Sequence, residues 1–452
     1  MLYNSHYKKI ETSSSNQKLD VANLFSNQLL RIFLYALPAA PVAALYFPVF
    51  VYLAEFYSSE FGLSIAVIGV TFLIVRLFDG FLDPVFGYLS DIIRVPILGR
   101  SVWLLISTPI LIVSVWNLYM PDPKGLPSTG YFIFWLVITT IGWSAFITPY
   151  YALGTELTQD YNKRSVVAIC REASVLTGTV IAACLYAFSE NSTNGFRNIA
   201  YFIMLTLPVF SFICVISTKK STINELKFNS LSGIYEFVRN ISKNRPYLKL
   251  VSAYFINGAA NGLPASLFIY FVNAKLNLSE YAGILLLVYF ISAILAVPVW
   301  IYLGSYIIKP KLWCLSMVYA SGIFFFVIFV GDGDLIPFLI ICCLSGTAVG
   351  ADLGIPASIQ ADIIDVDTQE TGDDRAGLFF AVWSIITKSA IAISSGLGLI
   401  LLSIVNFSDK GENSGLVLLI LTLLYCVIPI LLKLVSVIIV WSFVSDKSLL
   451  KS

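Results

Sequence analysis

Three ionisable residues interrupt an apolar stretch near the start of the chain, where "SIAVIGVTFLIVRLFDGFLDPVFGYL" carries Arg76, Asp79 and Asp83. Residues three and four apart share a helix face, so these side chains line one stripe of a helix. Because charges facing lipid are costly, the stripe is expected to face the protein interior or a water-filled path. Two carboxylates one turn apart repel unless a cation, a proton or an arginine lies between them. Such oxygen pairs suit a small hard cation, and a structural Arg–Asp network is the alternative.

A lysine interrupts a second apolar stretch, "FFAVWSIITKSAIAI", at position 388. A buried lysine either pairs with a carboxylate or shifts its pKa. Lys388 is therefore expected within salt-bridge or water-mediated reach of Asp79 or Asp83. Its depth in the stretch argues against the alternative, in which the side chain snorkels to an interface.

Asp352 and two asparagines form a further set of polar positions inside apolar stretches. Asp352 lies among small residues, and Gly350, Gly354 and Pro356 indicate a broken or tightly packed helix, so Asp352 either gates a path or caps a break. Asn257 and Asn261 share a face at i and i+4, where they serve as interhelical hydrogen-bond partners or as solute ligands.

Aromatic residues follow Pro149 in "SAFITPYYALGTEL". Aromatic faces beside a polar path commonly stack on sugars, although tyrosine is also frequent at membrane interfaces. We predict that five residues contact the solute: Tyr150, Tyr151, Asn257, Asn261 and Trp383.

The composition predicts a membrane protein and excludes several functions. Of 452 residues, 58% are hydrophobic and 12% charged, whereas soluble domains carry roughly 25% charged residues. A net charge of +1 gives no case for nucleic acid. The single histidine, His6, lies in a polar tail, which excludes a histidine metal cluster and histidine acid–base catalysis within the membrane. The seven cysteines lack metal-site spacing and are expected to be small buried hydrophobes. No nucleophile–base or metalloprotease pattern is present, so an enzyme is not expected.

Twelve stretches are long and apolar enough to span a membrane, which predicts an all-α membrane protein. A long polar segment divides them into two sets of six. The boundaries are residues 1–28 for an N-terminal tail, 29–216 for the first bundle, 217–246 for a central loop, 247–444 for the second bundle and 445–452 for a C-terminal tail.

Lysine and arginine distribution predicts the orientation, because cytoplasmic loops carry an excess of both. With the N-terminus inside, the inner loops hold most of the lysines and arginines and the outer loops only a few. This places both termini in the cytoplasm and the protein in a plasma membrane, or an inner membrane in a bacterium. "LSGIYEFVRNI" in the central loop could form a helix on the inner leaflet. "PVFGYLSD" and "PVWIYLGS" occupy corresponding spans of the two halves, as in parallel repeats of transporters.

Several motifs resemble those of a known transporter group. "GYLSD" followed by Arg94 resembles the loop signature of the major facilitator superfamily. More narrowly, the chain is similar to the glycoside–pentoside–hexuronide:cation symporters, the group that includes the melibiose permease, over nearly its whole length. The blocks that carry this resemblance are "RLFDGFLDPVFGYLSD", "PYYALGTELTQDYNKRSVVAICRE", "KNRPYLKL" and "QADIIDVDTQETGDDRAGLFFAVWSIITK".

The resemblance implies a cation symporter that works by alternating access. Matched position by position, Asp79 and Asp83 fall on cation-binding carboxylates and Lys388 on a lysine near them. Ser144 takes the place of a threonine hydroxyl that helps to hold the cation, and Arg76 matches an arginine of the same helix. Gating or structural roles are predicted for Asp91, Arg94, Asp352 and Asp362.

The chain also departs from the pattern of this group. Leu82 replaces an asparagine between the two carboxylates, which removes one oxygen and favours H⁺ over Na⁺ without deciding between them. The acidic residue that helps to hold the sugar on the first helix has no counterpart, and Ile147 stands where a second acid is expected. The coupling residues are thus retained, while the galactoside-binding pair is not.

We predict a secondary active transporter that couples Na⁺ or H⁺ to symport of a sugar or related polar solute. The alternative is a carrier of a lysolipid-like or other amphipathic solute on the same fold. No cofactor beyond the coupling cation is expected. The predicted partners are the solute and the lipid bilayer, not nucleic acid, and the protein is expected to be a monomer.

Overall fold

The computed structural model describes residues 28–444, apart from 94, 96–97, 123–126, 158–160, 219–243, 372–375 and 409–412. Within the described residues, twelve helices are long and apolar enough to cross a membrane, which confirms the predicted all-α, twelve-span architecture. The predicted inner-leaflet helix "LSGIYEFVRNI", the C-terminal tail and all of the N-terminal tail except Gln28 lie outside the described residues.

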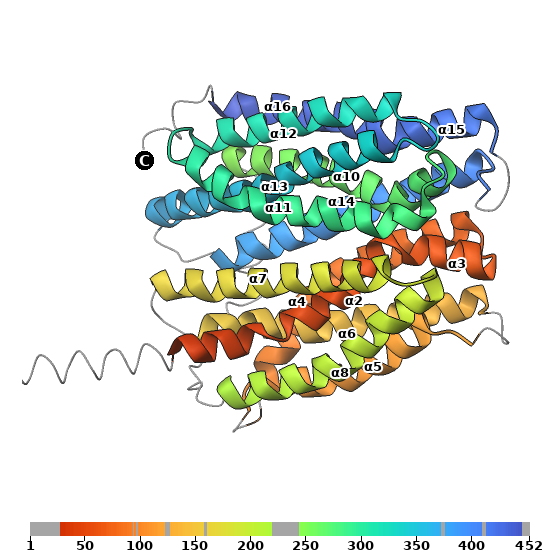
Figure 1. The fold of residues 1–452 in the computed structure, drawn as a ribbon. Coiled ribbons are helices and arrows are strands. Elements are labelled where there is room, and N and C mark those ends of the chain that lie inside the picture. The colour runs from red at the N-terminus through yellow and green to blue at the C-terminus, as the bar shows by residue number, and fades with distance from the viewer. Residues whose placement is uncertain are drawn as a thin grey trace, which may run out of the picture.

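The helices form two bundles that lie side by side (Figure 1). The first span starts at Gln28 and includes α2. The N-terminal bundle contains α2 (Ala39–Val51), α3 (Leu53–Phe61), α4 (Ile65–Ile92), α5 (Val102–Tyr119), α6 (Thr129–Glu156), α7 (Tyr161–Ala187) and α8 (Ser192–Thr218). The C-terminal bundle contains α10 (Arg245–Ala274), η2 (Ser279–Tyr281), α11 (Ala282–Gly304), α12 (Lys309–Phe325), η3 (Phe326–Phe329), α13 (Leu335–Thr371), α14 (Ala376–Ile404), α15 (Gly415–Thr422), η4 (Leu423–Val427) and α16 (Ile428–Val444).

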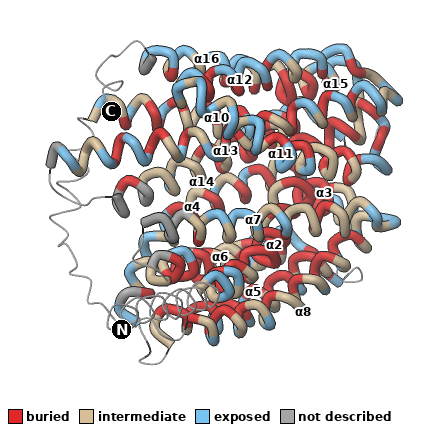
Figure 2. Tube along the Cα trace, turned by 60° about the vertical axis from the view of Figure 1, so that its left-hand side comes forward, coloured by how far each residue is buried: buried red, intermediate tan, exposed pale blue. Residues whose placement is uncertain are grey.

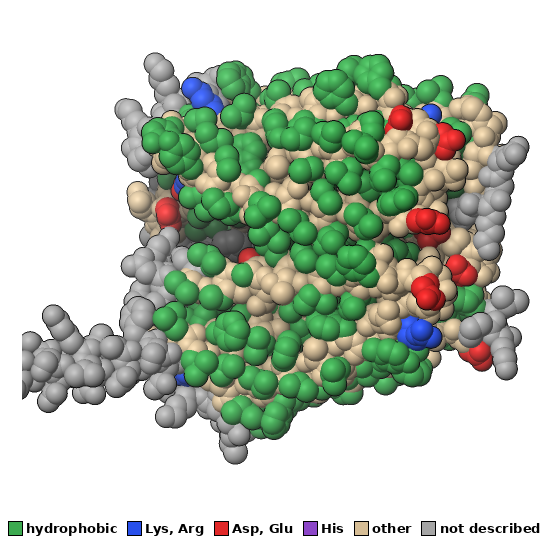
Figure 3. All heavy atoms as spheres, in the orientation of Figure 1, with side chains coloured by type: hydrophobic (Ala, Val, Ile, Leu, Met, Phe, Trp, Pro, Cys, Tyr) green, Lys and Arg blue, Asp and Glu red, His purple; other side chains and the backbone are tan. Residues whose placement is uncertain are grey.

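Burial separates the inner from the outer surfaces of the bundles. Figure 2 shows buried residues on the faces that point into each bundle and exposed residues on outward faces such as that of α16. The outward faces carry large apolar side chains, including Phe81, Leu205 and Ile301, each at least 70% exposed. Figure 3 shows apolar side chains spread over the middle of one face, with acidic groups toward one end. Such a band suits a hydrocarbon environment, in which each helix satisfies its own backbone hydrogen bonds.

Two helices differ from their predicted form. From its apolar length, the first span is expected to run from about residue 29 to about residue 56, but α2 ends at Val51, and α3 begins after Tyr52. α13 is one continuous helix through Gly350 and Pro356, so Asp352 lies within a helix and does not cap a break. Gly350 allows close packing against α11, because a Cβ atom added there would lie 3.1 Å from Cγ2 of Val297, whereas Gly354 has no atom within 4 Å of an added Cβ.

The two bundles are joined most closely along α4 and α14. We call the end of the molecule with Gln28 and Val444 the tail end, and the opposite end, with Gly62 and Asn277, the far end. Near the far end, a Cβ atom added at Gly69 would lie 2.9 Å from Cβ of Leu399, and one added at Gly396 would lie 2.6 Å from Cβ of Leu73. Glycine at both positions therefore allows the helix backbones to approach closely.

Further contacts close the far end. Ser58 of α3 and Tyr270 of α10 are joined by a 3.2 Å hydrogen bond between their hydroxyls. The rings of Phe47 and Phe290 meet edge to face, 5.2 Å apart. Toward the tail end, on the left of Figure 3, the surface is hollowed between the two bundles. The structure is thus closed at the far end.

Candidate functional site

The carboxylates of Asp79 and Asp83 converge on one ammonium group. Lys388 Nζ lies 2.8 Å from Asp79 Oδ2 and 2.9 Å from Asp83 Oδ2. Helical spacing turns both carboxylates to one face of α4, and α14 brings the lysine to that face from the other bundle. The expectation that Lys388 lies within salt-bridge reach of these carboxylates therefore agrees with the geometry.

Hydroxyl groups complete the surroundings of the two carboxylates. Ser144 Oγ donates to Asp79 Oδ1 at 2.6 Å, and Thr148 Oγ1, one turn along α6, donates to Asp83 Oδ1 at 3.2 Å. From α14, Ser384 Oγ donates to Asp83 Oδ2 at 3.1 Å. Every carboxylate oxygen of the pair thus has a partner: the two Oδ2 atoms contact the ammonium, and the two Oδ1 atoms accept from hydroxyls of α6.

The two carboxylates differ in depth. The side chain of Asp79 is 4% exposed, that of Asp83 18% and that of Lys388 14%. Buried ions are stable only when they are paired and hydrogen-bonded, which this arrangement provides. A small cation placed between the carboxylates would have to displace the ammonium, because the two would occupy the same position.

Arg76 lies apart from the carboxylates, although it belongs to the same stripe of α4. Its guanidinium carbon lies 3.3 Å from the centre of the Phe50 ring, and Nη2 is buried without a partner among the described residues. A guanidinium over an aromatic face is held by a cation–π interaction. Of the cations considered from sequence, Lys388 and not Arg76 neutralises the aspartates.

A second buried ion pair lies within the C-terminal bundle. Lys433 Nζ of α16 lies 2.9 Å from Asp352 Oδ2 and donates to Asn257 Oδ1 at 2.9 Å. Asn261 donates to Asp352 Oδ2 at 3.1 Å, and the indole of Trp313 donates to Asp352 Oδ1 at 3.2 Å. Three residues singled out from sequence, Asn257, Asn261 and Asp352, thus meet in one polar cluster, and both asparagines act as interhelical hydrogen-bond partners.

The predicted aromatic residues have different surroundings. Tyr150 is fully buried, stacks on Tyr35 and donates to its carbonyl at 2.9 Å, so it packs the N-terminal bundle and is not accessible to a solute. Its neighbour Tyr151 is 42% exposed and carries the guanidinium of Arg171 4.0 Å above its ring. Trp383 is half-buried and stacks on Tyr254, with ring centres 3.9 Å apart.

The predicted gating residues are only partly described. Asp362 forms an exposed ion pair with Lys309, whose Nζ lies 2.6 Å from Oδ1. Both partners belong to the C-terminal bundle, so this pair does not bridge the two bundles. Arg94 and the side chain of Asp91 lie outside the described residues.

Sequence reasoning missed several residues of these clusters. Thr148 follows Ser144 by one helical turn, and Ser384 precedes Lys388 by one turn, so both were visible as hydroxyls on already marked faces. Lys433 interrupts the apolar stretch "PILLKLVSVII" and carried the same signal as Lys388. Trp313 had no signal in the sequence, since its partner Asp352 is 39 residues away.

Curated proteins similar to the chain are transporters from bacteria and vertebrates. It is 22% identical to an uncharacterized symporter of Synechocystis, and the match covers 76% of this chain and 79% of that protein. It is 23% identical to the isoprimeverose transporter of Lactiplantibacillus pentosus, over 84% and 81% of the two chains. It is also 23% identical to the sodium-dependent lysophosphatidylcholine symporter 1 of Mus musculus, over 74% and 70%.

Solved structures agree on the fold. A bacterial homologue of the iron transporter ferroportin, in an inward-facing state, superposes with a TM-score of 0.66 at 13% identity, over 94% of this chain and all of that one. The nucleoside transporter NupG gives 0.62 at 12% identity, over 94% and 100%. The model of the MFS/sugar transport protein family matches residues 34–447. The chain therefore belongs to the MFS/sugar transport protein family, as a multi-pass membrane protein with twelve candidate spans in the part that the structure describes.

Proposed function

We propose that the protein couples entry of an organic solute to a cation held by Asp79 and Asp83. The observation that carries this proposal is the position of Lys388 Nζ, 2.8 and 2.9 Å from the two carboxylates. Two anionic groups of one bundle converge there on a single cation of the other bundle. A diffusible cation that binds carboxylate oxygens would compete with the lysine for that position.

This competition provides a physical route for coupling. Lys388 belongs to α14 and the carboxylates to α4, so the ion pairs join the two bundles. When a cation replaces the ammonium, this electrostatic link is lost and the relative stability of the two orientations of the bundles changes. Because linkage is reciprocal, a solute that favours the same orientation raises the affinity for the cation by the same factor.

The ligand set favours Na⁺ over H⁺ as the coupling ion. Na⁺ requires several fixed oxygens, and Ser144, Thr148 and Ser384 all bring hydroxyls within 2.6–3.2 Å of the carboxylate oxygens. These three hydroxyl oxygens compensate for the asparagine oxygen that is missing because Leu82 stands at that position. The mouse relative is named as sodium-dependent. H⁺ coupling remains the second candidate, in which a proton on one carboxylate would release the lysine.

A sugar or related polar solute is the first candidate for the cargo. The family description and the name of the Lactiplantibacillus relative support this class. Tyr151 lies one turn beyond Thr148 on α6, so its ring and the guanidinium of Arg171 lie on the same face as the cation site. An aromatic ring with a guanidinium provides stacking and hydrogen-bond donors, which are the contacts that a polar ring requires.

An amphipathic solute is the second candidate. Ile147 is buried and apolar where a sugar-binding acid is expected, and α2 carries no charged residue. The mouse relative is named for lysophosphatidylcholine. The apolar surface of α2 would contact a hydrocarbon chain more favourably than the hydroxyl groups of a sugar ring.

The proposed membrane topology places both termini in the cytoplasm. The support is the excess of lysine and arginine in the loops of the tail end, such as Arg100 and Lys309, over those of the far end. The far end would then face outward, and the hollow between the bundles would face the cytoplasm. In a bacterial cell, the membrane would be the inner one.

Solute binding in membrane vesicles over a range of Na⁺ concentrations and pH tests the proposal. Candidate solutes comprise pentosides, hexosides and a lysophospholipid. Asp79→Asn and Asp83→Asn should each make solute binding insensitive to the coupling cation and abolish uphill uptake, because each removes a charged ligand. Phe78→Leu, on the exposed side of α4, should change neither. If both Asn variants keep the cation dependence of the unmodified protein, the charged stripe is structural and the proposal is wrong.

A further inference from the structure

A cavity of about 130 Å³ lies within the C-terminal bundle. Its walls come from α10, α11, α12, α13 and α16, with Val51 of α2 and Tyr425 of η4 also in contact. None of the residues around the Lys388 ion pairs lines it. Protein interiors hold few voids larger than a water molecule, so a cavity of this size is a distinct feature of the bundle.

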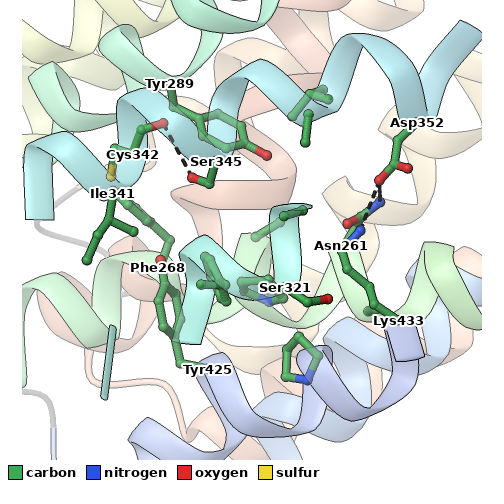
Figure 4. Close-up of a pocket in the computed structure, with 18 of the residues that line it drawn as sticks. Asn261, Phe268, Tyr289, Ser321, Ile341, Cys342, Ser345, Asp352, Tyr425 and Lys433 are labelled. Carbon is green, nitrogen blue, oxygen red and sulfur yellow. Dashed lines mark hydrogen bonds and ion pairs between the residues drawn. The ribbon is translucent and has the colours of Figure 1, made fainter. Parts of the chain in front are cut away.

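Small side chains create the cavity at positions where larger ones would fill it. Ala260 and Ala265 face it from α10, Ala320 from α12 and Ala348 from α13. Most of the remaining wall is apolar and includes the ring of Phe338. The rings of Phe268 and Tyr425 also belong to it (Figure 4). For comparison, an engineered apolar cavity of about 150 Å³ binds benzene. The space therefore suits one ring or a short hydrocarbon chain.

One end of the cavity is polar. Asn261, Asp352 and Lys433 lie together there, away from Phe268 and Tyr425 (Figure 4). Both oxygens of Asp352 already accept hydrogen bonds, Oδ1 from Trp313 and Oδ2 from Asn261 and Lys433. The carboxylate is thus satisfied within the protein and is not the group that a ligand would use.

Lys433 retains one donor. An ammonium group has three N–H bonds, and two of them are directed to Asn257 and Asp352. No third acceptor lies within hydrogen-bond distance among the described residues. The residue is 8% exposed and lines the cavity, so the remaining donor is available to an oxygen that enters the cavity. An unsatisfied charged donor in an apolar site selects strongly for such an oxygen.

We propose that this cavity is a binding site for a small amphipathic molecule, made of one ring or short hydrocarbon chain and one hydrogen-bond-accepting oxygen held by Lys433. The apolar body fills the space left by the alanines, and the oxygen accepts the third hydrogen bond of the ammonium. This site is separate from the cation site and does not depend on the proposed function. A ligand there contacts helices of the C-terminal bundle and Val51 of the N-terminal one.

Photolabelling of the full-length protein in liposomes tests this site. The probe is benzyl alcohol that carries a diazirine, and peptide mass spectrometry locates the adducts. Adducts are expected on cavity residues of α10, α12, α13 and α16. Unlabelled benzyl alcohol should compete at least about tenfold better than toluene at equal concentration in the bilayer. Toluene has no oxygen, so it leaves the third N–H of Lys433 without a hydrogen bond. Adducts confined to lipid-facing residues would overturn the proposal.

Two variants and a control distinguish how the apolar wall and the polar end of the cavity contribute to ligand binding. Ala320→Phe should fill the cavity and abolish its labelling, whereas Leu315→Phe, on the exposed side of the same helix, should leave it unchanged. The double variant Asp352→Asn/Lys433→Met removes both charges together, which avoids an unpaired buried ion. It should keep the labelling but lose the preference for the alcohol. Persistence of labelling in Ala320→Phe, or of the tenfold preference in the double variant, contradicts the assignment.

Discussion

At the scale of single residues, two lysines in apolar helices are neutralised in different ways. Lys388 pairs with two aspartates of the other bundle, whereas Lys433 pairs with one aspartate and one asparagine of its own bundle. Formal charge therefore differs between the clusters. The Lys388 cluster carries one excess negative charge and can accept a cation, while the Asp352–Lys433 pair is neutral and binds its own bundle together.

Replacing Lys388 should strengthen cation binding and abolish active transport. In Lys388→Met the carboxylates lose their internal competitor, so we expect Na⁺ to bind at least about tenfold more tightly, given that a charged hydrogen bond is worth roughly 1.5–3 kcal/mol. Active uptake should be lost, because no cation from α14 re-forms the link after release. The concentration dependence of Na⁺-induced thermal stabilisation measures the affinity.

The exposed ion pair Lys309–Asp362 provides the control for this experiment. Both side chains are at least 42% exposed, and such pairs contribute little to stability. Lys309→Met should therefore leave Na⁺ affinity and uptake unchanged. Weaker Na⁺ binding in Lys388→Met would show that the lysine assists the cation and does not compete with it.

At the scale of helices, α4 and α14 carry both the ion pairs and the closest backbone contact between the bundles. Gly69 and Gly396 permit this contact near the far end. The aspartates and Lys388 meet further along the same two helices. The electrostatic link and the steric contact therefore act on one helix pair, and a change in the distance between these helices should affect both.

A methyl group at this contact should disturb the closed far end. Gly396→Ala places a Cβ atom 2.6 Å from that of Leu73, and overpacking of this kind costs typically about 1–3 kcal/mol. We expect a lower unfolding temperature in detergent and slower uptake. Gly322→Ala, on α12 with no atom within 4 Å of its added Cβ, should not lower the unfolding temperature. Equal effects of the two substitutions would show that the α4–α14 contact is not tight.

At the scale of the whole molecule, the structure is closed at the far end and hollowed toward the tail end. Alternating access then requires the far-end contacts to break. The hydrogen bond between Ser58 and Tyr270 joins the two bundles, whereas a similar 3.2 Å bond between Tyr186 and Ser192 lies within the N-terminal bundle. These two serine–tyrosine pairs provide a matched test.

Cross-linking the far end should stop transport reversibly. Cysteines at positions 58 and 270, joined by a short reducible bifunctional reagent, should abolish uptake, and reduction should restore it. The same treatment of cysteines at positions 186 and 192 should leave uptake largely intact, because that pair moves as one body. Transport that continues with the 58–270 cross-link in place would exclude opening at this end.

Much of this protein could be predicted from its sequence, because the bilayer restricts the solutions available to the chain. Apolar length alone predicts twelve helices, and helical periodicity places Asp79 and Asp83 on one face. The cost of a buried charge predicts that Lys388 requires a carboxylate. These inferences depend only on local spacing and on the solvent.

Only the tertiary structure decides which groups meet across helices. Periodicity gives the face of a helix but not the neighbour of that face, so the sequence could not show that Lys388 lies between the aspartates while Arg76 packs on Phe50. For the same reason, Tyr150 proved to be buried against Tyr35, and Asp352 proved to pair with Lys433 of the last helix. The cavity beside that pair likewise depends on the packing of five helices.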